Sequence, residues 1–255
     1  MAPDNAYIIE LQEVHKSFGP QHVLKGLSLK IPRGRTTVII GRSGGGKSVI
    51  LKQMIGLIRP DQGRVLVDGY DLNIMDDRQL NEVRRRYGML FQDAALFDSM
   101  TVGQNVAFPL KEHTRLTPEQ IGDTVIEKLG MVGLVNVENK MPSQLSGGMR
   151  KRVGLARAIA LEPEIILYDE PTTGLDPPLS DAINRLIIET QEKLGVTGVV
   201  ISHDIDGAFQ VGHEIAMLYE GKIIAHGTSE EIKASEDAVV QQFIHGRADG
   251  PIEVV

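Results

Sequence analysis

A stretch near the start of the chain has the residue types and spacing of a loop that binds nucleotide phosphates. Residues 41–48, Gly-Arg-Ser-Gly-Gly-Gly-Lys-Ser, fit the pattern G-x-x-x-x-G-K-S/T. The glycines let backbone N–H groups curl around a polyphosphate, and a helix beginning near Lys47 directs its positive end at the same anion. Lys47 would reach the β- and γ-phosphates, and the Ser48 hydroxyl would bind Mg²⁺. The alternative is a glycine-rich turn with a surface lysine, but a predicted strand before the loop and a helix after it favour the phosphate site.

Two carboxylates, Asp169 and Glu170, follow a short apolar run over residues 165–168. Asp169 could hold Mg²⁺, usually through water, because this ion gives up its water reluctantly. Glu170 could orient and deprotonate a water molecule that attacks a phosphate. Paired acids at the end of a strand indicate only a loop when they stand alone. Together with the phosphate loop, the functional interpretation becomes the stronger one.

Ser146 and the two glycines after it precede a helix rich in small and apolar residues. They could form a second place where backbone N–H groups hold an anion. From the residues alone, a helix cap is the simpler interpretation. The cationic run from Arg150 to Arg152 indicates a solvated face rather than a nucleic-acid patch, because the chain as a whole is acidic.

Three isolated residues have both a structural and a functional interpretation. Gln92 would ordinarily lie on the surface, and His203, at the end of a predicted strand, would ordinarily be a structural histidine. Phe18 would by default pack in the core or in a turn, although an aromatic ring upstream of the phosphate loop could also stack on a base. On the residues alone, the structural interpretation is the default for each.

The elements that must position these residues follow from apolar periodicity. Short runs rich in β-branched residues predict buried strands over 35–40, 165–168 and 199–201, each followed by a polar or glycine-rich segment. Apolar residues at helical spacing predict helices from Lys47 to Ile58 and from Leu179 to Leu194. Strand, helix and strand in this order predict a parallel α/β sheet, in which ligands bind at the carboxyl ends of the strands.

The middle of the chain, residues 93–161, has little strand character. Thr117 to Gln120 has the pattern of a capping box with proline at the first helical position, and helices are predicted over 118–129 and 150–161. We therefore expect a helical subdomain inserted into the α/β core. The last residues, 246–255, form a short tail with two open interpretations: a frayed terminus, or an apolar strip that packs on a second copy.

Composition excludes several classes of protein. The chain has 255 residues, of which 42% are hydrophobic and none is cysteine, so a disordered chain, a disulfide scaffold and a thiol nucleophile are excluded. No apolar run is long enough to span a bilayer, and the first residues lack the pattern of a secretory signal. The formal charge of -7 disfavours broad binding to nucleic acid, so any anion must be held locally.

Taken in order, these motifs resemble the nucleotide-binding subunit of an ABC transporter, from Leu11 to about Gly246. Gly41 to Ser48 is similar to the Walker A loop, Leu145 to Met149 to the signature motif LSGGQ, and Gly174 to Asp176 to the D-loop. The resemblance implies an α/β fold of the P-loop NTPase (RecA-like) type with a mixed or parallel sheet, an antiparallel N-terminal part and an inserted helical subdomain. The domains it implies are a core over 1–92 and 162–245, the insert over 93–161 and the tail over 246–255.

The resemblance also implies roles for individual residues in an ATPase that uses ATP and Mg²⁺. Glu170, His203 and Gln92 would serve catalysis, and Ser48, Gln92 and Asp169 would hold Mg²⁺, the last through water. The residues implied to bind ATP are Phe18, Gly41, Arg42, Ser43, Gly44, Gly45, Gly46, Lys47, Ser48, Val49 and Asp176, joined by Ser146, Gly147 and Gly148 of a second copy. Each ATP would therefore lie between two copies of the chain.

Two positions depart from the pattern of that family. Met149 replaces the common glutamine of the signature motif, and Val49 replaces the common second hydroxyl residue after the loop lysine. Neither change removes a group implied to touch Mg²⁺ or the attacking water, so we expect hydrolysis to survive both.

A finer resemblance, carried by residues 95–102, 105–114, 145–150 and 246–251, is to the ATPases of Mla/Mce-type phospholipid transport systems. It implies a peripheral protein on the cytoplasmic face of the bacterial inner membrane. Its helical subdomain would dock on an integral membrane permease, in a complex with an Mce-type substrate-binding protein, and no nucleic acid would be bound.

Two alternatives remain open at this point. One is an ATPase subunit of an importer for another small solute, such as an amino acid. The other is a non-transport ABC protein of DNA repair or translation, which the acidity and the single cassette disfavour.

Overall fold

The computed structural model describes residues 6–253, which form two compact units. The first unit comprises residues 1–80 and 199–255, and the second comprises residues 81–198. The limits of these two units differ from the predicted domain boundaries. The predicted domains stay a prediction. Within residues 6–253, none of the helices combines the length and the apolar character that crossing a bilayer requires.

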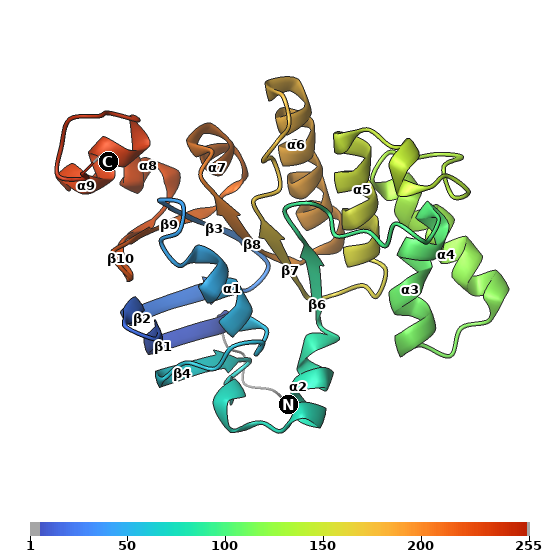
Figure 1. Ribbon diagram of the computed structural model, residues 1–255, viewed down its shortest axis with the longest axis horizontal. Helices are drawn as coiled ribbons and strands as arrows, with labels where there is room; N and C mark the ends of the chain where they lie inside the picture. Colours follow the sequence, from blue (N-terminus) through green and yellow to red (C-terminus); the bar gives the residue numbers. More distant parts are fainter. Residues whose placement is uncertain (1–5, 254–255) are drawn as a thin grey trace. The chain divides into compact units, whose positions relative to one another are not determined.

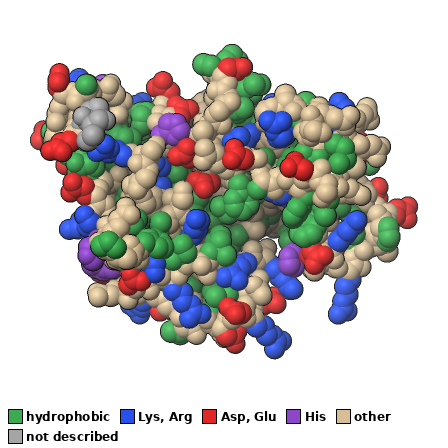
Figure 2. Space-filling view, viewed as in Figure 1, with side chains coloured by type: hydrophobic (Ala, Val, Ile, Leu, Met, Phe, Trp, Pro, Cys, Tyr) green, Lys and Arg blue, Asp and Glu red, His purple; other side chains and the backbone are tan. Residues whose placement is uncertain are grey.

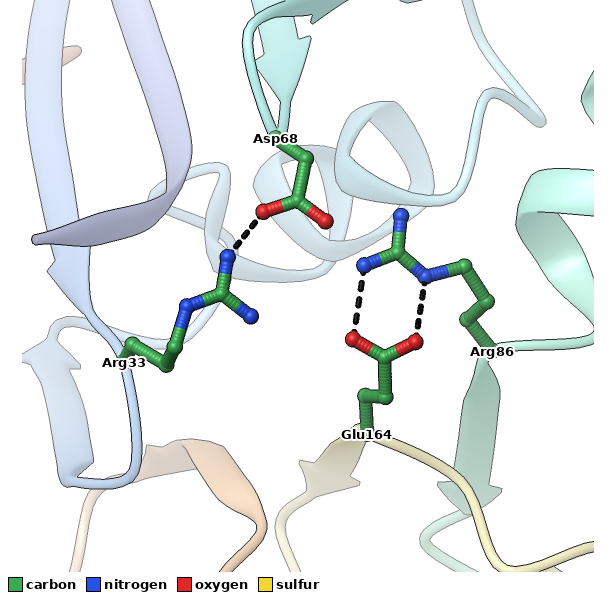
Figure 3. Close-up of polar contacts among 4 residues, drawn as sticks. All are labelled: Arg33, Asp68, Arg86 and Glu164. Atoms are coloured by element: carbon green, nitrogen blue, oxygen red, sulfur yellow. Dashed lines mark hydrogen bonds and ion pairs between the residues drawn. The ribbon is translucent and has the colours of Figure 1, made fainter. Parts of the chain in front are cut away.

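The first unit contains an antiparallel sheet of four strands, as the predicted antiparallel N-terminal part requires (Figure 1). Its order is β2-β1-β4-β5, with bounds β1 Tyr7–Phe18, β2 Gln21–Pro32, β4 Gln62–Val67 and β5 Tyr70–Asp71. A 3-10 turn, η1 (Leu72–Ile74), follows β5. The end of β2 is tied to the turn after β4 by an ion pair between Arg33 and Asp68 (Figure 3).

The first unit also contains the strand that leads into the phosphate loop. The bounds are β3 Thr36–Gly41, β8 Thr197–Ser202, β9 Glu214–Tyr219 and β10 Lys222–Gly227, in the order β10-β9-β3-β8. The central strand β3 is buried along its whole length and runs parallel to β9, with Val38 opposite Ile215. Strand β10 is antiparallel to β9, so the predicted parallel sheet is a mixed sheet with an antiparallel edge.

The helices of residues 6–253 that lie wholly in the first unit are α1 (Lys47–Met54), α7 (Ile205–Val211), α8 (Ser229–Lys233) and α9 (Ala238–Ile244). The helix predicted from Lys47 to Ile58 is too long by four residues at its end. Gly56 adopts a left-handed φ of 64°, and the N–H groups of Leu57 and Ile58 both donate to the carbonyl of Lys52. These bonds satisfy the last carbonyls of the helix and end it, although apolar spacing continues.

The C-terminal segment of the first unit folds back on α9. The side-chain Nε2 of Gln242 donates to the carbonyl of Ile252 at 3.0 Å, and its Oε1 accepts the N–H of Ile252 at 2.6 Å. Ile252 is 7% exposed. A frayed terminus is therefore wrong as far as Ile252, while packing on a second copy stays a prediction. Val254 and Val255 lie outside the described residues.

The second unit pairs β6 (Tyr87–Leu90) with β7 (Ile165–Asp169) in parallel, with Gly88 opposite Ile166. The two strands start together because Arg86 and Glu164, just before them, form a doubly hydrogen-bonded ion pair of 2.8 and 2.7 Å (Figure 3). The N–H of Glu164 also donates to the carbonyl of Arg86 at 3.0 Å. Polar residues that follow these strands thereby share one end of the pair.

Helices form the rest of the second unit, with bounds α2 Asp77–Arg84, α3 Val102–His113, α4 Pro118–Met131, α5 Gly147–Ala158 and α6 Pro177–Leu194, and a 3-10 turn η2 at Pro142–Gln144 (Figure 1). Helix α2 begins in the first unit. The capping box at Thr117 with Pro118 after it is confirmed, and Gly195 ends α6 at a φ of 64°.

The helix predicted over residues 150–161 lies three residues earlier. Its start is fixed by Ser146, whose hydroxyl accepts the N–H of Met149 at 3.3 Å, and this brings Gly147 and Gly148 into the first turn. Its end comes at Ala158, with Ile159 as the C-cap. Glycines that looked like a loop before the helix are thus part of it.

Candidate functional site

The predicted phosphate loop joins β3 to α1, and two of its glycines are required by its geometry. Gly41 has a φ of 153°, and a Cβ there would lie 2.4 Å from the carbonyl oxygen of Leu218 in β9. Gly46 caps α1 with a φ of 104°, and a Cβ there would lie 2.8 Å from the side chain of Val23. Any other residue at either position would be strained or would clash.

Lys47 is 4% exposed and its ammonium lies over the loop itself. Its Nζ donates to the carbonyls of Gly41 at 2.7 Å and Arg42 at 3.0 Å. The loop is further closed by a bond from the N–H of Gly45 to the carbonyl of Arg42 at 3.1 Å. The lysine therefore ties the first residues of the loop together, and its positive charge would attract a phosphate bound there. Ser48, in the first turn of α1, is exposed beside it.

A cavity of about 540 Å³ in the first unit opens onto the loop. It is lined by Gly41, Arg42 and Ser43 on one side and by His203, Asp204 and Asp206 on another. His203 is exposed directly after β8, where parallel strands place residues that contact ligands. The structure thus brings His203 to the cavity of the phosphate loop.

Phe18, the last residue of β1, is 46% exposed, with the Nζ of Lys16 5.5 Å from the centre of its ring. It is neither core nor buried turn packing. An exposed ring with a cation against it offers a face on which a base could stack.

In the second unit, Asp169 ends β7 and Glu170 follows in a backbone conformation that side chains avoid. Glu170 has a φ of 48°, and the hydroxyl of Thr173 donates to its Oε2 at 2.9 Å. The N–H of Thr173 also donates to the Glu170 carbonyl at 3.2 Å. Backbone held in such a conformation by its neighbours is a frequent feature of catalytic positions.

A lysine that the sequence placed on a solvated face is buried here. Lys151 is 5% exposed, and its Nζ donates to the carbonyl of Gln92 and lies 3.4 Å from the carbonyl oxygen of Glu170. Burial lowers the pKa of Lys151, while the charges of Asp93, Glu170 and Asp169 act in the opposite direction. The sequence did contain a signal, because Lys151 has helical spacing with Gly148 and Leu155 on the buried face of α5.

Gln92, exposed after β6, lines a cavity of about 210 Å³ in the second unit together with Asp93, Gly147, Lys151 and Thr173. The structure therefore brings Gln92, Lys151 and Thr173 together, and two of them bond to Glu170.

Ser146 and Asp176 both act as helix caps. The hydroxyl of Ser146 caps α5, and the carboxylate of Asp176 caps α6 by accepting the N–H of Leu179 at 3.0 Å. Gly147 and Gly148 form the first turn of the twelve-residue helix α5, whose N–H groups and dipole favour an anion at this end. Ser146 can therefore cap α5 while the N–H groups of the same helix end remain suited to an anion.

The side chains predicted to hold Mg²⁺, those of Ser48, Asp169 and Gln92, suit this ion better than a transition metal. A serine hydroxyl, an aspartate carboxylate and a glutamine amide are hard oxygen donors. Residues 6–253 contain no group of three or more His, Cys, Asp or Glu side chains that could form a protein cage for a metal. Oxygen donors of this kind fit an ion that also keeps phosphate oxygens and water as ligands.

Residues 24–173 match the family described as ABC transporter. The chain belongs to this family. As an ATP-binding cassette of the P-loop NTPase fold it is an ATPase. We refer to it below as the cassette.

Two groups of curated relatives match the cassette over almost its whole length. The intermembrane phospholipid transport system ATP-binding protein MlaF of Escherichia coli K12 is 43% identical, over 97% of the cassette and 92% of the relative. The probable ribonucleotide transport ATP-binding protein mkl of Mycobacterium leprae is 44% identical, over 96% of the cassette and 70% of the relative.

Solved structures are similar in fold and in sequence. The ATP-binding cassette MJ0796, solved as a dimer in a post-hydrolysis state with ADP and Pi, has a TM-score of 0.79 and 35% identity, over 86% of this chain and 98% of its own. The cbiO1 protein of Clostridium perfringens, part of the transporter complex cbiONQ, has a TM-score of 0.83 and 31% identity, over 91% and 92%.

Proposed function

We propose that this cassette is the ATP-hydrolysing subunit of a transporter that moves phospholipid between the inner and outer membranes of a bacterium. The observation that carries this proposal is its 43% identity to MlaF over 92% of that protein's length. A match over 97% of the chain includes the helical segment, a part in which cassettes for different cargoes would be expected to differ.

The chemistry follows from the residues of the two units. The N–H groups of residues 41–48 and the ammonium of Lys47 would bind the β- and γ-phosphates. Mg²⁺, held by Ser48 with Asp169 and Gln92, would neutralise phosphate charge. Glu170 would accept a proton from a water molecule as the water oxygen attacks the γ-phosphorus and the bond to the bridging oxygen breaks, leaving ADP and phosphate. His203 would donate a hydrogen bond to the γ-phosphate.

A second copy of the cassette would complete each site. Ser146, Gly147 and Gly148 lie at a helix N-terminus, which suits a γ-phosphate presented by another chain. In a head-to-tail pair with two-fold symmetry, two ATP molecules would be enclosed between the copies. ATP would favour the closed pair and hydrolysis would loosen it, because the closed and open pairs bind nucleotide with different affinity. The dimeric structure of MJ0796 supports this arrangement.

The second unit offers a surface for a membrane partner. A groove of about 470 Å³ contains three partly exposed rings, Phe91, Phe97 and Phe108, at 40%, 42% and 36% exposure. Exposed aromatic clusters of this kind mark protein contacts. A short helix of an integral membrane permease would dock here and hold the cassette at the cytoplasmic face of the inner membrane. An Mce-type substrate-binding protein would belong to the same complex.

A different cargo is the alternative that the comparisons favour next. The mkl protein has a similar identity to the chain and is described as a probable ribonucleotide transport ATP-binding protein. The cassette spans 70% of that relative and 92% of MlaF, which favours phospholipid. Nucleic acid as a partner is disfavoured, because the net charge is -7 and acidic and basic side chains are interspersed on the face shown in Figure 2.

Purification of the tagged cassette from its native membrane tests the proposal. We expect an integral membrane permease and an Mce-type protein to co-purify, with phospholipid bound to the complex. Recovery of a permease with a solute-binding protein, without phospholipid, would contradict the phospholipid assignment and leave the ATPase assignment intact.

A further inference from the structure

Lys151 is a buried charged residue to which the chemistry above gives no part. It lies in the second turn of α5 at 5% exposure, and lysine is almost never buried to this degree without partners. The neighbouring Arg150, by contrast, is exposed. A structural residue would be expected to bind its own helix or an adjacent core element.

The partners of Lys151 are instead the two loops that carry the proposed machinery of hydrolysis. One hydrogen bond goes to the carbonyl of Gln92, in the loop after β6, and the ammonium also lies 3.4 Å from the carbonyl oxygen of Glu170, after β7. These carbonyls are 78 positions apart in the chain and share this one ammonium. Lys151 is therefore a direct physical link between the glutamine loop and Glu170.

The position of Glu170 depends on such support. Its φ of 48° is unfavourable for a residue with a side chain, so the surrounding contacts must hold it. The hydroxyl of Thr173 holds the carboxylate, and the N–H of Thr173 together with Lys151 holds the carbonyl. A cationic donor makes a stronger bond than a neutral one, so Lys151 is suited to fixing this backbone.

Helix α5 fastens the glutamine loop at a second point. Arg157, two turns after Lys151, donates to the carbonyls of Ala94 at 2.8 Å and Ala95 at 2.7 Å. Arg157 also lines the aromatic groove with Phe91 and Phe97. Part of the aromatic groove and the residue that contacts Glu170 therefore belong to α5 and to the loop after β6, whereas Phe108 of the groove lies in α3.

We propose that Lys151 is a positioning residue that couples the loop of Gln92 to the backbone of Glu170, so that the place of Glu170 depends on the state of that loop. This inference rests on the proposed role of Glu170 as the base. It assigns Lys151 an effect on the chemical step rather than on nucleotide binding, because both carbonyls that its ammonium contacts belong to residues proposed to serve catalysis, Gln92 and Glu170.

The test compares Lys151→Met with Lys151→Arg in the full-length cassette, with Lys193→Met as the matched control. Lys193 pairs with Glu189 on the exposed surface of α6. For Lys151→Met we expect kcat for ATP hydrolysis to fall about tenfold or more, since small displacements of a reacting group have such effects. KM and the affinity for a non-hydrolysable ATP analogue should stay within about twofold, and Lys151→Arg should recover much of kcat.

Three outcomes would overturn the inference: kcat unchanged in Lys151→Met, analogue binding lost together with kcat, or no recovery by arginine. If the methionine variant does not fold, Lys151→Gln, which keeps a donor without the charge, is measured by the same criteria. Glu170→Gln, assayed in parallel, separates the two proposals. Normal turnover in that variant would remove Glu170 as the base, whereas wild-type kcat in Lys151→Met with an inactive Glu170→Gln would remove only the positioning role.

Discussion

At the level of single residues, Glu170 is the one to which the proposed function assigns the most specific chemistry. Its left-handed backbone and the bond from Thr173 hold its carboxylate in one place after β7. A carboxylate that is fixed in this way can accept a proton from an oriented water, whereas an amide of the same shape cannot.

Glu170→Gln is predicted to separate binding from chemistry. The amide keeps the size of the side chain but cannot act as a base, so turnover should fall by about 10²-fold or more. ATP should still bind, and the pair of copies should accumulate in its closed form, seen as an ATP-dependent dimer by light scattering. Turnover near that of the unchanged chain would exclude Glu170 as the base.

Lys47→Ala is predicted to weaken nucleotide binding. The change removes the buried ammonium and its bonds to the carbonyls of Gly41 and Arg42. Loss of a charged donor to phosphate should lower the affinity for ATP by about ten- to a hundredfold. Equilibrium binding of a labelled ATP analogue measures the effect, with Lys52→Ala, an exposed lysine of the same helix, as the control. Unchanged affinity would contradict the role of residues 41–48.

The sequence predicts the phosphate loop from residue types and spacing, because the turn after β3 needs glycine at fixed positions. Positions 41 and 46 have a positive φ and close backbone or side-chain neighbours, so only glycine fits there. Such a requirement is visible in the sequence as a glycine at a fixed position. The sequence pattern around Lys151, in contrast, predicts the wrong environment for this side chain. Between Arg150 and Arg152 it looked like part of a solvated charge run, and its burial depends on loops far away in the sequence.

Among the helices, apolar periodicity predicts which segments are helical better than it predicts where each helix begins and ends. Apolar periodicity places α5 and α1 correctly, but their ends are set by bonds that periodicity does not report. Ser146 starts α5 three residues before the predicted first residue, and Gly56 ends α1 where the apolar pattern continues. Capping residues therefore set the ends of these two helices, even where the apolar pattern predicts a different end.

The C-terminal segment is held to α9 by one buried amide. Gln242 is 4% exposed and satisfies both the N–H and the carbonyl of Ile252. A Cβ at Gly250 would lie 2.4 Å from the Oε1 of Gln242, so the turn that brings Ile252 back also requires glycine. This segment and α9 line the cavity beside the phosphate loop.

Gln242→Ala is predicted to release the C-terminal segment and lower the free energy of unfolding by about 1–3 kcal/mol, because buried backbone groups lose their partners. Urea unfolding measures the change. Removal of residues 248–255 should have a similar effect, and Gln242→Ala should add little in the shortened chain, since both changes remove one interaction. Fully additive losses would show that Gln242 stabilises the chain by other contacts.

At the scale of the whole molecule, the sequence predicted the class of fold and the resemblance predicted the family, and both are confirmed. The predicted domain boundaries stay a prediction. The predicted core joins residues 162–245 to the N-terminal part, whereas residues 81–198 form one compact unit. Pairing of β6 with β7 links segments separated by three helices, and side-chain patterns do not report which strands pair.

In the proposed pair, one chain holds half of each ATPase site and Ser146 acts on the ATP of a second copy. Pairs of copies carrying two different affinity tags test it, with Lys47→Ala and Ser146→Arg as the changes. If sites form between copies, changes placed on separate copies fall in the same site and leave the other intact. Both changes on one copy would damage both sites.

The deciding measurement is the rate of ATP hydrolysis by these two purified mixed pairs. We predict measurable turnover when Lys47→Ala and Ser146→Arg lie on separate copies, and turnover at the background level when both lie on the same copy. The reverse result, with activity only when both changes share one copy, would exclude sites shared between copies and show that each chain completes its own site.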